Sequence, residues 1–180
     1  MRVMIDACVL YPTVMREVML GCAKAGLFEA RWSARILEEW ARAAGKLGPA
    51  QEVWARGEIA SLGARFPQAI VPYDQAQERQ FWLPDPADIH VLAAAVVGSC
   101  DGILTMNAKD FPKNILGDAV LLRWDPDGFA LLLLAQAPLQ VRSVAETVLA
   151  EANRLSPAPW SMRALMKKAR MPRFGKALEA

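Results

Sequence analysis

The sequence is poor in the residues that build imidazole and thiolate sites. Its 180 residues include one histidine, His90, and three cysteines, Cys8, Cys22 and Cys100. A single histidine excludes zinc chemistry based on histidine clusters, and the cysteine spacing matches no metal-binding pattern. We therefore expect reduced cysteines that act as small hydrophobic residues in a cytoplasmic protein.

Long apolar segments are also missing. The longest, residues 129–135, is far shorter than the roughly 20 residues of a membrane-spanning helix, so no membrane partner is expected. Residues 1–10 lack the charged start, apolar stretch and cleavage site of a signal peptide, and we expect them to begin with a strand. Because 54% of the residues are hydrophobic, the chain can still bury a substantial core.

Several catalytic motifs are absent. Neither GxGxxG nor GxxxxGK[ST] occurs, which argues against dinucleotide-binding and P-loop proteins. Asp6 is followed by Ala7 and Cys8, so the paired aspartates of the aspartyl-phosphate phosphatases are missing. Without GxSxG, and with one distant histidine, a hydrolase triad is not expected either.

Charge is distributed unevenly along the chain. Residues 1–137 carry 13 basic and 16 acidic groups, whereas residues 138–180 carry 8 basic and 3 acidic groups. An acidic body with a basic tail suits a protein that holds cations and contacts a polyanion. Pro138 interrupts the pattern of elements, so we expect a main domain over 1–137 and a helical C-terminal extension over 138–180.

Hydrophobic periodicity predicts strands that alternate with helices. This alternation is typical of an α/β fold with a mainly parallel sheet. The expected strands cover residues 2–6, 103–105 and 120–122, with 69–72 as a further candidate. The expected helices cover residues 13–25, 33–44, 49–64, 74–79, 85–97, 125–137, 139–155 and 160–170.

Acidic and amide side chains gather at four places in this pattern. Asp6 ends the first strand, and one carboxylate of the pair Glu38 and Glu39 can face inward, because adjacent helical positions point about 100° apart. The other places are the start of helix 85–97 and the loop after strand 103–105. These hold Asp85, Asp88, Asn107 and Asp110.

Each of these residues has a structural explanation of its own. Asp85 and Asp88 suit the start of a helix, Asn107 and Asp110 suit a turn, and an exposed helical Glu is common. Together, however, they lie where one crevice beyond the ends of parallel strands could collect them. Carboxylates without histidine or cysteine favour Mg²⁺ or Mn²⁺.

Four blocks of sequence resemble a known family in order and spacing. They are VMIDACVLYP, RWSARILEEW, LPDPADIHVLAAA and ILTMNAKDFP, and they resemble the PIN domain, above all the VapC-type toxins of bacterial toxin–antitoxin pairs. The resemblance covers about residues 2–130, and the tail is similar to the helical extension of one VapC-like subgroup. It implies a PIN-like three-layer α/β/α fold with a central, mainly parallel sheet.

The resemblance also implies roles for individual residues. Asp6, Glu39 and Asp88 match the first three acids of the family. Asn107 stands where many PIN nucleases carry Asp, so Asp110 is expected to supply the remaining carboxylate. The implied catalytic residues are Asp6, Glu39, Asp88, Asn107 and Asp110. The implied ligands of one or two metal ions are Asp6, Glu39, Asp85, Asp88 and Asp110.

The function implied by the resemblance is hydrolysis of RNA phosphodiester bonds by an Mg²⁺- or Mn²⁺-dependent endoribonuclease, the toxin of a type II toxin–antitoxin system. Its implied partners are RNA, a cognate antitoxin protein and a second copy in a homodimer. Arg16, His90 and Lys109 are candidates for substrate contact. Residues 163–176, with six basic groups and no acid, could contact RNA or simply form a solvated face.

Two alternatives remain open. One is a PIN nuclease that processes RNA outside a toxin–antitoxin pair. The other is a non-catalytic PIN binding module, because Asn107 replaces an acid and the remaining acids could serve structure alone.

Overall fold

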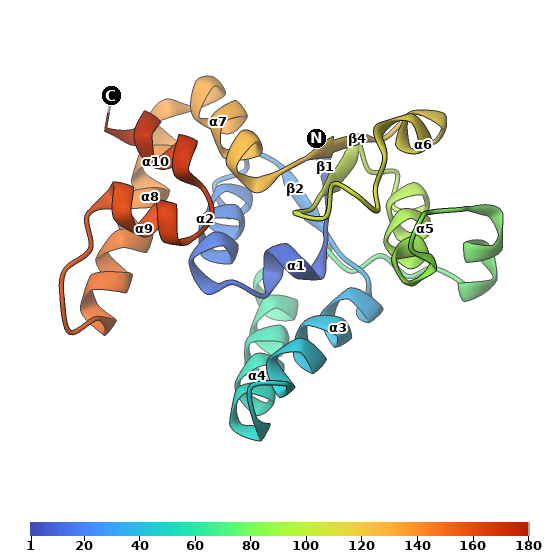
Figure 1. The fold of residues 1–180 in the computed structure, drawn as a ribbon, viewed down its shortest axis with the longest axis horizontal. Helices are drawn as coiled ribbons and strands as arrows, with labels where there is room; N and C mark the ends of the chain where they lie inside the picture. Colours follow the sequence, from blue (N-terminus) through green and yellow to red (C-terminus); the bar gives the residue numbers. More distant parts are fainter. Residues whose placement is uncertain (180) are drawn as a thin grey trace. The chain divides into compact units, whose positions relative to one another are not determined.

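A sheet of four parallel strands organises the fold (Figure 1). The computed structural model, drawn in Figure 1, describes residues 1–179, and the strand order is β2-β1-β3-β4. The strands are short: β1 (Arg2–Ile5), β2 (Glu29–Arg31), β3 (Gly102–Leu104) and β4 (Leu122–Trp124). The expected α/β fold with a parallel sheet and flanking helices is therefore confirmed.

The register of β1 and β3 brings two polar residues together. Ile5 pairs with Leu104 at the carboxyl ends of these adjacent strands. The next residues, Asp6 and Thr105, consequently meet at the same edge of the sheet. The backbone N–H of Asp6 continues the ladder by donating to Leu104 O at 3.1 Å.

The sheet belongs to the first of two compact units, which comprises Met1–Tyr11 and Glu29–Trp124. Its apolar helix α5 (Ile89–Val97) packs on β1 and β3. Helix α3 (Ala34–Gly45) begins at Ser33, whose Oγ accepts from Ile36 N, and packs on α4 (Pro49–Arg65). The shorter elements are α1 (Ala7–Leu10), η1 (Gln75–Gln80), η2 (Pro86–Asp88) and α6 (Lys113–Asp118).

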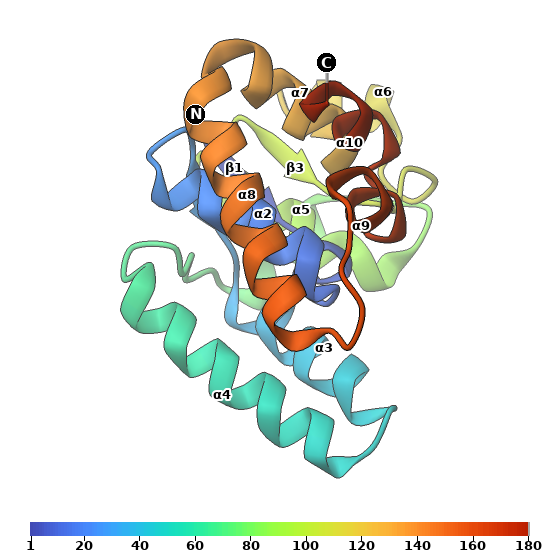
Figure 2. The same cartoon turned by 90° about the vertical axis from the view of Figure 1, so that its left-hand side faces the viewer.

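The second unit comprises Pro12–Phe28 and Asp125–Ala180, and its described residues form helices and no strand. Helix α2 (Thr13–Lys24) packs on α7 (Pro126–Gln136), α8 (Pro138–Leu155) and α9 (Met162–Lys168) (Figure 2). The last helix is α10 (Pro172–Leu178). Buried Asp127 caps it by accepting hydrogen bonds from the N–H groups of Arg173 and Phe174.

Several short elements differ from the expectations. β2 was not expected, because Glu29-Ala30-Arg31 carries almost no hydrophobic signal. Helices α1, α6 and α10 were not expected either, and β4 begins two residues later than the predicted strand at 120–122. The candidate strand 69–72 contributes only a single bridge, between Trp32 and Ile70.

The two compact units of the structure are not separated by a single cut of the chain at residue 137. Helices α2 and α7 pack with the C-terminal helices rather than forming part of the unit that holds the sheet. The domain boundary at 137 itself stays a prediction. Within residues 1–179, no helix is both long and apolar enough to cross a membrane.

Candidate metal centre

A chain of hydrogen bonds links the ends of β1 and β3 to the start of α5. Thr105 Oγ1 donates to Asp6 Oδ2 at 2.6 Å and accepts from the backbone N–H of Asn107 at 3.0 Å. The side-chain amide of Asn107 donates to Asp88 Oδ2 at 2.9 Å. Asp6 and Thr105 are buried. The two carboxylates are therefore held by neutral donors at the carboxyl edge of the sheet.

Three carboxylates converge beside this chain. One oxygen from each of Asp85, Asp88 and Asp110 lies within 4.8 Å of the others. Asp85 begins η2, and its Oδ1 accepts from Ala87 N at 2.9 Å. Asp110 comes from the loop after β3. Residues far apart in sequence thus bring a concentrated negative charge to one place.

This crowding changes the acidity of Asp88. Partial burial, the largest cause, and the negative charges of Asp6, Asp85 and Asp110 together raise its pKa from 3.8 to about 6. The nearby His90 acts in the opposite direction. Because each neighbouring carboxylate disfavours the charged form, the cluster is electrostatically strained at neutral pH. A bound cation would relieve that strain.

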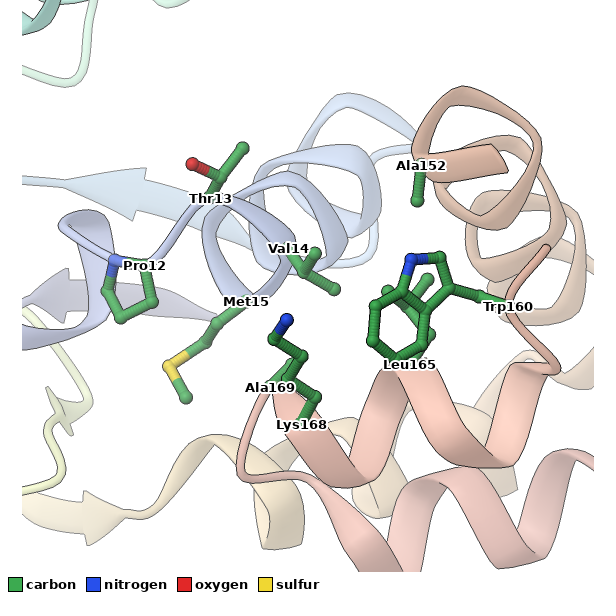
Figure 3. Close-up of a pocket in the computed structure, with 9 residues that line it drawn as sticks. All are labelled: Pro12, Thr13, Val14, Met15, Ala152, Trp160, Leu165, Lys168 and Ala169. Atoms are coloured by element: carbon green, nitrogen blue, oxygen red, sulfur yellow. The ribbon is translucent and has the colours of Figure 1, made fainter. Parts of the chain in front are cut away.

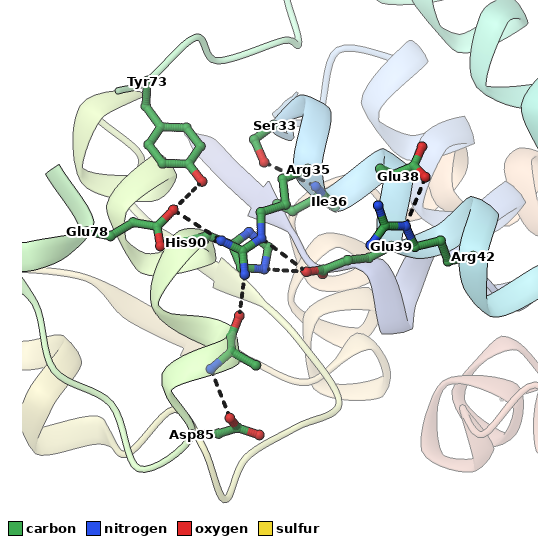
Figure 4. A network of polar contacts seen from close by, with 11 residues as sticks. Ser33, Arg35, Ile36, Glu38, Glu39, Arg42, Tyr73, Glu78, Asp85 and His90 are labelled. Atoms are coloured by element: carbon green, nitrogen blue, oxygen red, sulfur yellow. Dashed lines mark hydrogen bonds and ion pairs between the residues drawn. The ribbon is translucent and has the colours of Figure 1, made fainter. Parts of the chain in front are cut away.

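Glu39 lies in a second polar network, shown in Figure 4. His90 Nε2 is 2.8 Å from Glu39 Oε1, although the pair lacks the alignment of a hydrogen bond, and His90 Nδ1 has no hydrogen-bond partner among the described residues. Arg35 Nε lies 3.5 Å from the same Glu39 oxygen. The glutamate is thus held between an arginine on its own helix and a fully buried histidine on α5.

Arg35 also connects this network to the acidic loop. Its Nη1 donates to both oxygens of Glu78 at 3.2 and 3.3 Å, and its Nη2 donates to Ala87 O at 3.4 Å. Tyr73 donates to Glu78 Oε1 at 2.9 Å, and burial together with this bond raises the pKa of Tyr73 to about 12. One guanidinium therefore contacts α3, η1 and the η2 turn between Asp85 and Asp88.

The two glutamates of α3 have different surroundings. Glu38 accepts from Arg56 at 2.9 Å and from Arg42 at 3.0 Å, and these bonds lower its pKa to about 2. Those arginines face it from α4 and from its own helix. Glu39 instead faces His90 of α5. The assignment of Glu39 rather than Glu38 as a metal ligand stays a prediction.

The three candidates for substrate contact have unequal access to solvent. Lys109 is exposed and precedes Asp110. Arg16 is 1% exposed, and its Nε donates to Glu17 at 3.2 Å in the helical unit. His90 is 0% exposed. Lys109 is thus accessible to solvent, whereas Arg16 and His90 are not, and the substrate role of all three residues stays a prediction.

Two residues of the site were missed from the sequence. Thr105 was expected only to end a strand, yet it links Asp6 to Asn107. Cys8 was expected to be a buried apolar residue, but it is half-buried and its Sγ lies 3.0 Å from Asp6 Oδ2 as a donor. Burial and the Asp6 charge raise the pKa of Cys8 to about 12, which keeps it a thiol. A hydroxyl residue directly after a buried strand was the one available signal.

The donor set suits a divalent cation. All the converging atoms of Asp85, Asp88 and Asp110 are carboxylate oxygens, which are the ligands that Mg²⁺ and Mn²⁺ prefer. Asp6 acts on Asp88 through its charge. The residues therefore fit the metal that the sequence predicted, while the ligand set itself stays a prediction.

Comparison with known proteins gives one match. The family model described as PIN domain matches residues 2–109. No curated protein matches the sequence, and no solved structure matches it. The matched segment contains Asp6, Glu39, Asp85, Asp88 and Asn107, and it ends one residue before Asp110.

Proposed function

The chain belongs to the PIN domain family, and we propose that it is an Mg²⁺- or Mn²⁺-dependent endoribonuclease. PIN domains are generally nucleases. The observation that carries the proposal is the convergence of Asp85, Asp88 and Asp110 within 4.8 Å, next to buried Asp6. Such a cluster attracts a divalent cation and repels RNA in the absence of one.

Each residue of the cluster has a distinct task in this proposal. The carboxylates of Asp6, Asp85, Asp88 and Asp110 would hold the cation, with Glu39 as a further candidate ligand, and Thr105 and Asn107 fix Asp6 and Asp88 by hydrogen bonds. With a divalent cation held by these residues, the site would supply a metal-bound water of lowered pKa and positive charge opposite the phosphate. Arg35 and His90 hold Glu39 at the edge of the site, and exposed Lys109 offers a positive charge to the RNA backbone.

We further propose that the enzyme is the toxin of a toxin–antitoxin pair, with a homodimer and a cognate antitoxin as its assemblies. Four blocks of sequence similar to VapC-type toxins support this role. An adjacent reading frame whose product copurifies with the chain and blocks RNA cleavage is the expected result. A nuclease without such a neighbour would instead be an RNA-processing PIN protein.

The central test is cleavage of a mixed RNA pool with Mg²⁺, with Mn²⁺ or with EDTA. We expect cleavage only with metal, and a loss on the order of 100-fold in Asp6→Asn and Asp110→Asn. Asp118→Asn is the matched control, because Asp118 is exposed at the last residue of α6. Circular dichroism verifies that each variant is folded.

Calorimetric titration with Mn²⁺ separates the remaining outcomes. Metal binding without cleavage of any RNA would favour a non-catalytic binding module. Absence of both metal binding and cleavage would refute the proposed function. Equal activity in Asp110→Asn and wild type would remove Asp110 from the ligand set.

A further inference from the structure

A cavity of about 280 Å³ lies in the helical unit (Figure 3). None of the residues that line it belongs to the acidic cluster of the candidate metal centre. The cavity is bounded by the first turn of α2, by α8, by α9 and by the loop between α8 and α9. The residues that line it are Pro12, Thr13, Val14, Met15, Ala152, Trp160, Leu165, Lys168 and Ala169. Most of these side chains are apolar, and Lys168 is the one charged residue among them.

The backbone of the aromatic residue of this cavity is anchored by hydrogen bonds. Trp160 N donates to Asn153 Oδ1 at 2.6 Å, and Asn153 Nδ2 donates to Trp160 O at 3.3 Å. Pro157 and Pro159 restrict the loop that precedes it. Trp160 nevertheless remains partly exposed. These bonds anchor the backbone that carries the indole, so the ring is presented at a defined place where a flat ligand can stack on it.

The charge beside the ring is positive. Lys168 Nζ lies over the Trp160 ring, 4.7 Å from its centre, so a base stacks on that face only when this flexible side chain moves aside toward the phosphate. Helix α2 begins at the cavity without a side-chain cap, which adds the positive end of a helix dipole. All six basic residues of segment 163–176 are exposed, and no acid interrupts that segment; Arg173 is paired with Asp125 and Asp127, and the other five have no such ion pair among the described contacts. These five are Arg163, Lys167, Lys168, Arg170 and Lys176.

We propose that this cavity is a binding site for single-stranded RNA, in which one base stacks on Trp160 and the adjacent phosphate meets Lys168. An aromatic platform next to a basic track is the arrangement that binds single strands with little sequence preference. The charge of segment 163–176 complements a polyanion and selects RNA over an apolar peptide as the occupant. The inference rests on RNA as the substrate in the proposed function and adds a second point of contact.

Fluorescence anisotropy of a labelled RNA of about 10 nucleotides tests the site with the full chain in EDTA. We expect Trp160→Leu to weaken binding roughly 10-fold, while Trp160→Phe, which keeps an aromatic ring, stays near wild type. Lys168→Met should make the dependence of log affinity on log salt less steep by about 0.7. Trp54→Leu and Lys24→Met are the matched controls, because both residues are exposed on other helix surfaces.

The outcomes separate this site from the metal centre. Equal affinity of Trp160→Leu and Trp160→Phe would overturn the proposal, as would a wild-type chain that binds no RNA in EDTA. Should Trp160→Leu fail to fold in thermal melts, an unchanged affinity and salt slope in Lys168→Met would overturn it instead. The binding assay contains no cation, so its result does not depend on whether the chain cleaves RNA. The cleavage assay likewise tests the metal centre whether or not RNA binds at Trp160.

Discussion

Asp88 is the residue at which charge crowding has the clearest consequence. In the folded, metal-free chain its pKa is about 6, against 3.8 ordinarily. The folded state therefore binds more protons than the unfolded state between these values, and stability falls as pH rises through that window. The loss of folding stability caused by Asp88 is absent below about pH 4 and complete above about pH 6. Since Asp88 is about half-exposed, it amounts to on the order of 1 kcal/mol.

Asp88→Asn should therefore stabilise the metal-free protein at pH 7 and abolish Mn²⁺ binding. Asn keeps a carbonyl oxygen that can accept from Asn107, so the fold loses little. The measurement is urea unfolding in EDTA from pH 4.5 to 7.5, where the difference from wild type should shrink toward the acid end. Asp118→Asn serves as the control and should show no such trend. A variant less stable than wild type at pH 7 would contradict the electrostatic argument.

Thr105 acts through two hydrogen bonds made by one hydroxyl group. Thr105→Val keeps the shape but leaves buried Asp6 and the Asn107 N–H without that partner. We expect a loss of about 1–3 kcal/mol in the free energy of unfolding and weaker Mn²⁺ binding, both measurable by urea unfolding and calorimetry. Thr105→Ser keeps the hydroxyl and should retain most of the stability and most of the Mn²⁺ affinity. Thr13→Val, at an exposed threonine, should change neither quantity.

At the scale of single residues, the sequence predicted candidates better than it predicted partners. Asp6, Asp85, Asp88, Asn107 and Asp110 were all selected because they follow strands or begin helices, and hydrogen bonds or charge interactions connect them. The partners Thr105 and Cys8 were missed, because a hydroxyl or thiol gains its role only from what lies across the sheet. The orientation of Glu39 depended on His90, 51 positions later in the printed sequence, which no local pattern reveals.

At the scale of elements, Arg35 ties the start of α3 to η1 and η2. Arg35→Met should loosen the turn that carries Asp85 and Asp88 and weaken Mn²⁺ binding roughly 10-fold. The free energy of unfolding should change by about 1 kcal/mol or less, because these ion pairs are partly exposed. Calorimetry and hydrogen exchange of residues 84–89 measure the two effects. Arg42→Met is the control, since Arg42 pairs with Glu38; an equal loss there would contradict a specific role for Arg35.

Long elements were predicted closely and short ones poorly. Helix α3 carries a strong apolar stripe and an Ser33 cap, so its start was predicted to within a residue. The strand β2 spans Glu29–Arg31 and contains one buried residue, Ala30. Its existence follows from pairing with β1 rather than from its own composition. Short segments of this kind are determined by tertiary contacts, which hydrophobic periodicity does not report.

At the scale of the whole molecule, the division of the chain has a direct test. The sequence places a domain boundary at residue 137, yet α2 and α7 pack on α8, and α7 also packs on α10. Val141, Ala145 and Phe174, which come from the C-terminal helices, are fully buried. A fragment of residues 1–137 would leave the apolar faces of α2 and α7 without these partners.

We therefore expect the 1–137 fragment to aggregate or to melt well below the full chain, even though it contains every acid of the metal centre. Size-exclusion chromatography and thermal melts of the two forms measure this directly. A monomeric fragment that melts as cooperatively as the full chain would instead establish an independent domain ending at residue 137. The stability of the metal centre would then be independent of α8, α9 and α10. If the fragment fails as expected, the C-terminal helices are an integral part of the fold, because they complete the packing of α2 (Thr13–Lys24) within the helical unit.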